Sequence, residues 1–254
     1  MWFLRAIWSL IAWPLAFVLM TLSFLVSLPF WPFVPFERFQ RQIPSPFFWR
    51  VLYCTLSRVT FLYDSKYDVS RNCVYTANHT SMLDAHVCVG AIHHPFCGVE
   101  NAAHFLVPVY GWLMRAANGI PVPRGAKRTE ALVEATKERA SRGISVLTFP
   151  EAHRTMDGRV RPFRRGAFVM AREAGLPIVP IGIRGMYHVL PKGSWVVNPG
   201  HLEIFMGRAY ETQGLSDAEL EALVEEVHRV IANWVENGVL PEGTVTQKSP
   251  RSAD

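Results

Sequence analysis

Apolar and polar positions divide the chain into an uncharged N-terminal stretch and a longer region of short alternating segments. Residues 6–28 carry no charge. At about 1.5 Å per residue, a helix of this length would cross the apolar core of a bilayer. After residue 65, short apolar runs alternate with amphipathic segments of helical spacing. This alternation is typical of an α/β fold.

The alternating region predicts a specific series of elements. Short apolar runs bounded by turn residues predict strands at 73–77, 96–100, 119–123, 145–150 and 177–183. Helical spacing predicts helices at 81–92, 107–117, 128–142 and 166–173. A later pair of runs, 194–199 and 201–207, predicts antiparallel edge strands joined near Pro199 and Gly200. The last helix is expected over 215–234, where Ser216 and Glu219 have the spacing of a capping box.

The uncharged N-terminal stretch predicts membrane association rather than a cleaved signal peptide or a buried core helix. It is too long for a signal peptide, and its basic start is a lone Arg5. The tract PFWPFVPF that follows, 29–36, suits a membrane interface. A second amphipathic stretch at 47–63 favours an N-terminal two-helix membrane module. Because Pro14 can kink the first helix, both a spanning and a re-entrant anchor are open.

Length and charge predict how the chain divides into domains and on which side of the membrane the α/β domain lies. The 254 residues are expected to form a membrane-associated module at 1–64, an α/β domain at 65–238 and a disordered tail at 239–254. By the positive-inside tendency, the arginines after the apolar stretch predict that the α/β domain lies on the cytoplasmic face of the membrane. These arginines are Arg38, Arg41, Arg50 and Arg58.

Composition also indicates which partners to expect. The net charge of +5 favours anionic lipids and phosphorylated substrates, whereas no interleaved basic and aromatic motif supports nucleic-acid binding. The four cysteines lack the spacing of a zinc site or a disulfide framework. We therefore expect ordinary thiols, no metal site and no nucleic-acid partner.

A histidine and an aspartate lie five positions apart in the stretch TANHTSMLD, residues 76–84. Ser81 and Asp84 fit a capping box at the start of a helix. Contact between His79 and Asp84 requires His79 to lie in the turn before that helix, because five residues along a regular helix separate two side chains onto different faces. The helix cap and a catalytic pair are therefore compatible.

Other residues with useful chemistry follow the expected strands. Asn78 and His79 follow the first strand, Arg124 follows the third, and Glu151 and Arg154 follow the fourth. In α/β sheets, ligands gather at the carboxyl ends of the strands. The sequence therefore predicts that a base, carboxylates and guanidinium groups lie along one edge of the sheet.

Four blocks of this region resemble the glycerolipid acyltransferases, typified by 1-acylglycerol-3-phosphate acyltransferase. They are NHTSMLD at 78–84, NGIPVPR at 118–124, FPEAHRT at 149–155 and LPIVPIGI at 176–183. The first is similar to the family's N-H-x-x-x-x-D and the third to its F-P-E-G-T-R-S, with Ala152 and His153 in place of Gly-Thr. Order and spacing agree over residues 73–185. The resemblance implies a glycerolipid-acyltransferase-like mixed α/β sheet flanked by helices, and no metal or organic cofactor.

The resemblance further implies a membrane-bound O-acyltransferase acting on lysophosphatidic acid. The acyl chain would pass from acyl-CoA or acyl carrier protein, as co-substrate, to the sn-2 hydroxyl. Since a thioester already has a good leaving group, the attacking hydroxyl is what needs a base. Histidine titrates near neutral pH, so His79 is the expected base and Asp84 the group that orients it. The expected substrate-binding residues are Asn78, Arg124, Glu151 and Arg154.

A second set of basic residues is expected to serve donor phosphates or the membrane surface collectively. Its members are Lys127, Arg159, Arg161, Arg164 and Arg165.

The sequence also leaves other functions open. One is the same transfer to another lysolipid, such as a lyso-aminolipid, because Ala152 and His153 alter the third block. Another is a membrane-associated serine hydrolase using Ser81, although no G-x-S-x-G elbow is present. A lipid-binding protein without activity would leave the aligned blocks unexplained.

Overall fold

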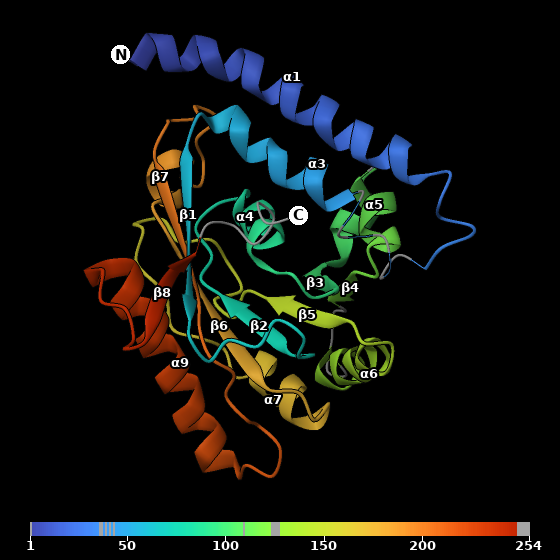
Figure 1. The fold of residues 1–254 in the computed structure, drawn as a ribbon, viewed down its shortest axis with the longest axis vertical. Helices are drawn as coiled ribbons and strands as arrows, with labels where there is room; N and C mark the ends of the chain where they lie inside the picture. Colours follow the sequence, from blue (N-terminus) through green and yellow to red (C-terminus); the bar gives the residue numbers. More distant parts are fainter. Residues whose placement is uncertain are drawn as a thin grey trace.

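A mixed β-sheet with helices on both faces forms the body of the protein (Figure 1). Within the residues that this computed structural model describes, eight strands form one sheet in the order β4-β3-β5-β2-β6-β7-β1-β8. The described residues are 2–35, 38, 40, 42, 44–108, 110–122 and 128–247.

The strands expected between residues 73 and 183 are confirmed as β2 to β6. The eight strands are β1 (Arg58–Asp64), β2 (Val74–Ala77), β3 (Phe96–Asn101), β4 (Ile120–Val122), β5 (Ser145–Thr148), β6 (Ile178–Arg184), β7 (His201–Met206) and β8 (Thr244–Gln247). Strands β2 to β6 pair in parallel with one another. Strand β7 runs antiparallel to β6 and parallel to β1, which makes the sheet mixed, as expected.

Alternate side chains of each strand face different layers of helices, as the two-residue period of a strand requires. Tyr75 and Ile181 pack on the face covered by α1, α3 and α4, whereas Val74 and Ile178 pack on the face covered by α7 and α9. The helices are α1 (Trp2–Ser27), α3 (Pro44–Arg50), η1 (Val51–Thr55), α4 (Asp84–Ala91), η2 (Ala102–Leu106), α5 (Tyr110–Ala116), α6 (Arg128–Ser141), α7 (Gly166–Glu173), α8 (Met186–Val189) and α9 (Asp217–Asn237).

The stretch at 47–63 does not form the second membrane helix that the sequence suggested. Helix α3 ends at Arg50, η1 ends at Thr55, and β1 begins at Arg58 inside the sheet. Phe61 and Tyr63 face the α1 and α3 layer while Leu62 faces the opposite side, so the apolar residues follow a strand period. The expected boundary at residue 64 is therefore wrong, because β1 belongs to the α/β domain.

Two expectations for the C-terminal part are also corrected. Residues 194–199 form no strand, and β7 lies within the sheet between β6 and β1 rather than at its edge. Part of the tail expected to be disordered, 244–247, is strand β8, which pairs antiparallel with β1. Both errors arise because a strand's neighbours are set by distant parts of the chain. Residues 248–254 lie outside the described residues.

Helix α1 lies lengthwise against the domain rather than projecting from it (Figure 1). The Trp8 indole N–H donates to the Cys54 carbonyl oxygen at 2.9 Å, and the Trp13 indole N–H donates to the Trp195 carbonyl oxygen at 2.7 Å. The Ser9 hydroxyl accepts from the Val197 N–H at 2.9 Å. Small residues let the helix approach closely: Ala6, Ser9, Ala12, Ala16, Ser23 and Ser27 are its buried side chains.

The turn between β6 and α8 generates a prediction about backbone packing. Gly185 has φ +89°, and a Cβ there would come within 2.1 Å of the His201 carbonyl oxygen. Left-handed strain costs about 1–2 kcal/mol and overpacking about 1–3 kcal/mol, so Gly185→Ala should lower the free energy of unfolding by roughly 3 kcal/mol. Urea denaturation in neutral detergent measures this difference.

Gly193→Ala is the matched control for that variant. Gly193 has φ +88°, but nothing lies within 4 Å of its would-be Cβ. The Gly193→Ala variant should therefore lower the free energy of unfolding only by the left-handed strain, about 1–2 kcal/mol. Equal losses in the two variants would show that the approach to His201 does not constrain the turn.

Candidate active site

His79 lies in the turn between β2 and α4, at the carboxyl end of β2. Its Nδ1 atom is 2.8 Å from Asp84 Oδ2. The Asp84 side chain is completely buried, whereas 24% of the His79 side chain is exposed. The structure thus brings together the two residues singled out in the sequence, and it leaves part of the imidazole accessible.

The Asp84 carboxylate also organises the turn around itself. Its Oδ2 atom accepts from the backbone N–H groups of Thr80 and Ser81, at 2.6 and 2.8 Å. Its Oδ1 atom accepts from the Thr80 hydroxyl at 3.1 Å. Asp84 is also the first residue of α4, where the helix dipole favours a negative charge. The expected capping box is not formed, because α4 begins at Asp84 with Leu83 as its N-cap residue, and Leu83 makes no side-chain cap hydrogen bond. The Ser81 N–H bond to the carboxylate instead belongs to the turn that precedes the helix.

Two contacts fix the orientation of the His79 ring. Because Nδ1 points at the carboxylate, it carries the proton in the neutral imidazole and leaves Nε2 as an acceptor. The ring also stacks on Phe149, with centroids 4.3 Å apart and planes 23° apart. An imidazole held in this way presents Nε2 as a base.

Glu151 holds the backbone of His79 from the loop after β5. Its Oε1 atom accepts from the His79 N–H at 2.7 Å, and its Oε2 atom accepts from the Arg161 N–H at 3.1 Å. The Thr155 N–H donates to the His79 carbonyl oxygen at 2.9 Å. Glu151 is only 5% exposed. Both carboxylate oxygens therefore bind backbone, which makes Glu151 a positioning residue rather than the substrate contact expected from the sequence.

Burial has an electrostatic consequence for Glu151. Desolvation raises the pKa of its carboxyl to about 7, although the N–H groups of His79 and Arg161 act in the opposite direction. Its carboxyl thus titrates near neutral pH, next to the histidine that it positions.

Asn78 is also a positioning residue. It is fully buried, and its side-chain amide donates to the Ile183 carbonyl oxygen at 2.9 Å. Its side-chain oxygen accepts from the Ile183 N–H at 2.7 Å. Since both ends of the amide bind the backbone of β6, Asn78 fixes the end of β2 against that strand. The substrate-binding role expected for it does not fit these contacts.

Arg154 and Arg124 were the expected arginines of the site. Arg154 is partly exposed on the loop after β5, and within the described residues its guanidinium has no hydrogen-bonded or charged partner. It is therefore free to bind an anion. Arg124 lies in 123–127, outside the described residues.

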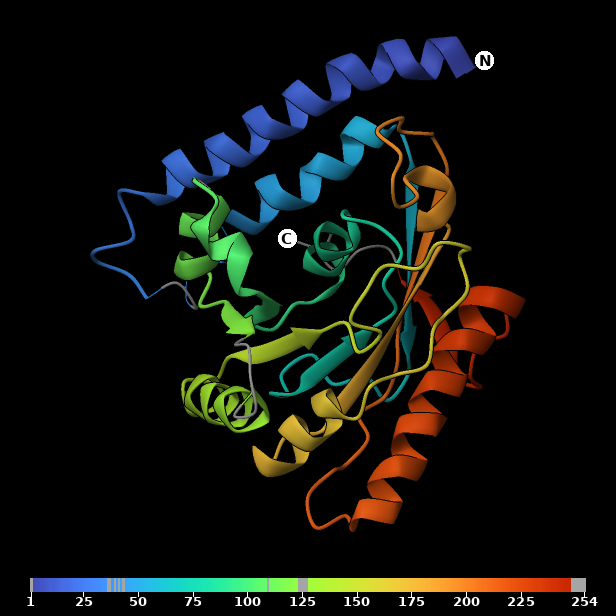
Figure 2. The same cartoon turned by 180° about the vertical axis from the view of Figure 1, so that it is seen from behind.

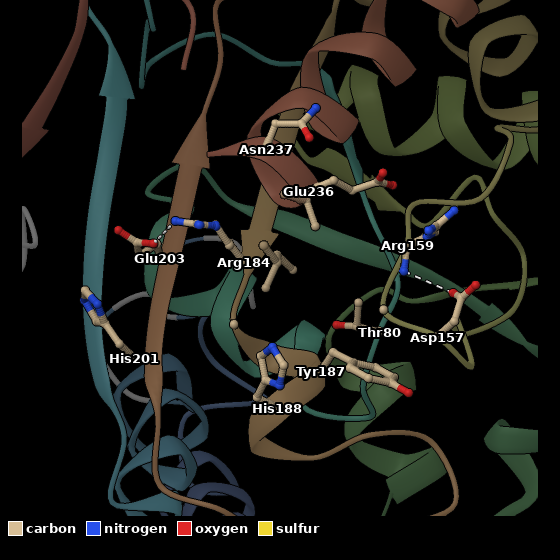
Figure 3. Close-up of a pocket in the computed structure, with 14 residues that line it drawn as sticks. Thr80, Asp157, Arg159, Arg184, Tyr187, His188, His201, Glu203, Glu236 and Asn237 are labelled. Atoms are coloured by element: carbon tan, nitrogen blue, oxygen red, sulfur yellow. Dashed lines mark hydrogen bonds and ion pairs between the residues drawn. The ribbon is translucent and has the colours of Figure 1, made fainter. Parts of the chain in front are cut away.

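A cavity of about 730 Å³ opens beside the turn between β2 and α4, with Thr80 in its wall (Figure 3). Arg184 at the end of β6 donates to Glu203 on β7 at 2.9 Å, and both line this cavity. Sequence reasoning missed these residues. Arg184 directly follows an expected strand, so the rule that pointed to Arg124 and Glu151 also applied to it. Other side chains labelled in Figure 3 are Asp157, Arg159, Tyr187, His188, His201, Glu236 and Asn237.

Comparison with known proteins identifies the family. A family model described as Acyltransferase matches residues 58–184, half of the chain. The chain belongs to the acyltransferase family. The matched region begins at β1 and ends with β6, so it contains the turn that carries His79 and Asp84.

Curated relatives of this acyltransferase include plant and bacterial proteins. It is 33% identical over 136 residues to the chloroplast 1-acyl-sn-glycerol-3-phosphate acyltransferase BAT2 of Brassica napus, covering 53% of this chain but 39% of that protein. It is 27% identical over 243 residues to a 1-acyl-sn-glycerol-3-phosphate acyltransferase of Pseudomonas aeruginosa, covering 92% of this chain and 89% of that one. This chain thus spans less than half the length of the chloroplast relative.

A solved structure shares the fold of this acyltransferase. The lysophosphatidic acid acyltransferase PlsC of Thermotoga maritima superimposes with a TM-score of 0.76 at 24% identity. The superposition covers 89% of this chain and 94% of that one. The mixed sheet with its helices is therefore the architecture of a known acyltransferase.

Ser81 is poorly placed to act as a nucleophile in this acyltransferase. Its side chain is fully buried, and its hydroxyl accepts from the Leu83 N–H at 3.3 Å. A serine that attacks a substrate must be exposed and hydrogen-bonded to a base. The geometry therefore argues against the hydrolase alternative, and it leaves Ser81 to shape the turn.

Ala152, which replaces the glycine of the family's third block, has a backbone conformation that glycine favours. Ala152 has φ +63°, in the left-handed region that glycine adopts without penalty. Its N–H donates to the Phe149 carbonyl oxygen at 3.0 Å, which closes a tight turn beside the ring that stacks on His79. The alanine therefore adds strain to this turn without adding a functional group.

Replacing Ala152 with glycine should stabilise the protein. Left-handed strain of about 1–2 kcal/mol would be relieved, against an entropy cost of about 0.4–1 kcal/mol, so we expect a net gain of about 0.5–1 kcal/mol. Chemical denaturation measures the gain. Ala131→Gly, at an exposed position of α6, should instead lose stability because glycine disfavours helix. If Ala152→Gly instead lowered the stability of the protein as the control does, the strain assigned to this turn would be refuted.

The raised pKa of Glu151 predicts a pH-dependent stability. Between its ordinary value of 4.5 and about 7, the folded state binds more protons than the unfolded state, so the free energy of unfolding falls as pH rises through this window. At about 1.36 kcal/mol per pKa unit, the contribution reaches about 3 kcal/mol.

Glu151→Gln removes this titration and should flatten that part of the stability profile. Unfolding measured at several pH values, in wild type and variant, gives the difference directly. Glu134→Gln, on the exposed face of α6, is the control and should leave the profile unchanged. A Glu151→Gln profile parallel to wild type throughout the window would contradict the raised pKa.

Proposed function

We propose that this acyltransferase is a membrane-bound O-acyltransferase that acylates lysophosphatidic acid. The fatty acyl chain passes from acyl-CoA or acyl carrier protein to the sn-2 hydroxyl, and phosphatidic acid is the product. The observation that carries the proposal is the imidazole of His79, held through Nδ1 by a buried carboxylate. The names of the plant and bacterial relatives, 1-acyl-sn-glycerol-3-phosphate acyltransferases, support the same reaction.

The geometry supports direct attack without an acyl-enzyme. The acceptor hydroxyl oxygen bonds to the thioester carbonyl carbon while His79 Nε2 takes the hydroxyl proton. Asp84 stabilises the imidazolium that forms. When the tetrahedral intermediate collapses, the C–S bond breaks and the leaving sulfur receives the proton from His79. The products are the ester and the free thiol, and His79 returns to its neutral form.

The proposed acceptor carries a phosphate that needs a cationic partner. Arg154 follows β5 on the loop whose Glu151 and Thr155 bind the His79 backbone. A phosphate held by the Arg154 guanidinium would therefore lie near the base, and the planar fork of arginine matches phosphate oxygens. Arg124 is proposed as the second arginine of this contact on sequence grounds alone.

Helix α1 is the proposed membrane anchor. The most apolar 18 residues of the helix have a mean hydropathy of 2.1, yet only 22% of them are buried, unlike a core helix. Large side chains such as Phe3, Leu10 and Phe17 are more than half exposed. Because hydrogen bonds hold α1 along the domain, we propose that it lies in the plane of one leaflet. The arginines that follow the apolar stretch favour the cytoplasmic leaflet.

Removing the base should abolish acyl transfer. We expect His79→Ala to lower kcat by about 10²–10⁴-fold, the usual contribution of a positioned base, and Asp84→Asn to be impaired in the same direction. Release of free thiol from acyl-CoA, measured with and without lysophosphatidic acid, follows the reaction. His104→Ala replaces an exposed histidine bound to Glu100 and should keep wild-type turnover.

The same assay tests the acceptor. Wild-type enzyme should release thiol with lysophosphatidic acid and far less with lysophosphatidylcholine or a lyso-aminolipid. Near-normal turnover in purified His79→Ala would refute the mechanism. A preference for the lyso-aminolipid would refute the acceptor while leaving acyl transfer intact, and thiol release that ignores every acceptor would point to hydrolysis.

A further inference from the structure

The loop between β5 and α7 carries three exposed arginines whose guanidinium groups form no ion pair within the described residues. They are Arg159, Arg161 and Arg164, and no carboxylate of the described residues forms a salt bridge or hydrogen bond with their side chains. Arg159 does interact by charge with Asp157, and this interaction adds to the hydrogen bond from Thr155 in lowering the pKa of the Asp157 carboxyl. Arg165, on the same loop, is paired with Asp217 and so leaves the set of phosphate-binding residues expected from the sequence. Several arginines elsewhere are also neutralised, such as Arg71 by Glu211, Arg184 by Glu203 and Arg229 by Glu226.

The backbone of this loop is fixed although its side chains face solvent. The Val160 N–H donates to Glu236 Oε1 at 2.9 Å, and the Arg161 N–H donates to Glu151 Oε2 at 3.1 Å. The Arg164 N–H donates to the Pro150 carbonyl oxygen at 2.9 Å. A cationic surface on a fixed backbone loses little entropy when an anion binds. The loop is therefore preorganised for an anionic ligand.

The loop is also tied to the catalytic histidine. The N–H groups of Arg161 and His79 bind the two oxygens of the same Glu151 carboxylate. Arg159 lines the cavity of Figure 3 together with Thr80, the residue after His79. The backbone that carries these arginines is therefore tied to the turn that carries His79.

The later part of the loop, from Val160 to Phe163, packs on the side of the sheet away from α1. Phe163 packs with the α7 and α9 layer, and its ring meets His228 of α9 edge-on, with centroids 5.0 Å apart. Helices α1 and α3 belong to the opposite layer. In Figure 2 the loop, in yellow, runs down to α7 while α1 crosses the top of the molecule. This placement favours a ligand that arrives from water over the headgroups of the membrane that α1 would enter.

We propose that Arg159, Arg161 and Arg164 bind the phosphate groups of the acyl donor. These are the phosphate that ends the pantetheine arm and, in acyl-CoA, the further phosphates of the nucleotide. The proposal rests on the proposed acyl transfer, in which Arg154 takes the acceptor phosphate. It explains why the loop carries more unpaired positive charge than one lysophosphatidic acid headgroup requires.

The test compares donors with and without phosphate. The variant R159Q/R161Q/R164Q is assayed with lysophosphatidic acid in neutral detergent micelles, using acyl-CoA, acyl carrier protein or an acyl-pantetheine that lacks phosphate. We expect kcat/KM for acyl-CoA to fall about 10–100-fold at low ionic strength, and the deficit to shrink as salt rises. With acyl-pantetheine, variant and wild type should be equally active, and KM for lysophosphatidic acid should not change.

A second triple variant controls for net charge. R71Q/K137Q/R229Q removes the same charge from exposed positions distant from the loop in sequence, and it should match wild type with every donor. Melting temperatures establish that both triple variants are folded.

The outcomes separate the sources of phosphate and the rival explanations. A deficit with both acyl-CoA and acyl carrier protein identifies the pantetheine phosphate, and a deficit with acyl-CoA alone identifies the nucleotide phosphates; both support the proposal. It is overturned by an equal deficit with acyl-pantetheine, by a raised KM for lysophosphatidic acid, by a deficit with carrier protein alone, or by one seen only on anionic vesicles. Wild-type transfer from acyl-pantetheine would uphold the proposed function independently, whereas no transfer from any donor would refute that function itself.

Discussion

The buried carboxylate of Asp84 is the group on which the geometry of the site depends. A charge removed from water is costly unless hydrogen bonds replace its solvation. Here the Thr80 and Ser81 amides, the Thr80 hydroxyl and the His79 ring supply those bonds. The backbone between β2 and α4 therefore curls around the carboxylate, and the histidine is oriented by the same requirement. The turn and the orientation of the histidine therefore depend on the same buried carboxylate.

The two faces of the sheet place different layers of helices around the turn that carries His79. One face carries α4, α3 and the apolar α1, the helix proposed as the membrane anchor. The other carries α7 and α9, against which the arginine-bearing loop packs. Glu151 joins the two, because it holds both the His79 turn and the loop. A ternary reaction between a membrane lipid and a water-soluble thioester needs such a meeting point.

The sequence predicts most of what depends on local pattern. Strands β2 to β6 and helix α7 follow from apolar periodicity, and the His79–Asp84 contact follows from its position in a turn before a helix. What was missed depends on distant partners. The sequence alone does not reveal whether the Glu151 carboxylate faces a substrate or the backbone N–H of His79, 72 residues away. It also does not reveal that the Asn78 side chain binds the backbone of Ile183. Strand β1 was mistaken for helix because its neighbours, β7 and β8, come from the far end of the chain.

The state of the His79 ring tests the central claim most directly. Nitrogen NMR of protein with ¹⁵N-labelled histidine distinguishes a protonated ring nitrogen from an unprotonated one. If Asp84 orients His79 as a base, the neutral ring carries its proton on Nδ1 and leaves Nε2 bare. The signals should be assigned to His79 by their loss in His79→Ala. A neutral ring protonated at Nε2 would contradict the account, because that nitrogen would have no lone pair with which to accept the acceptor's proton.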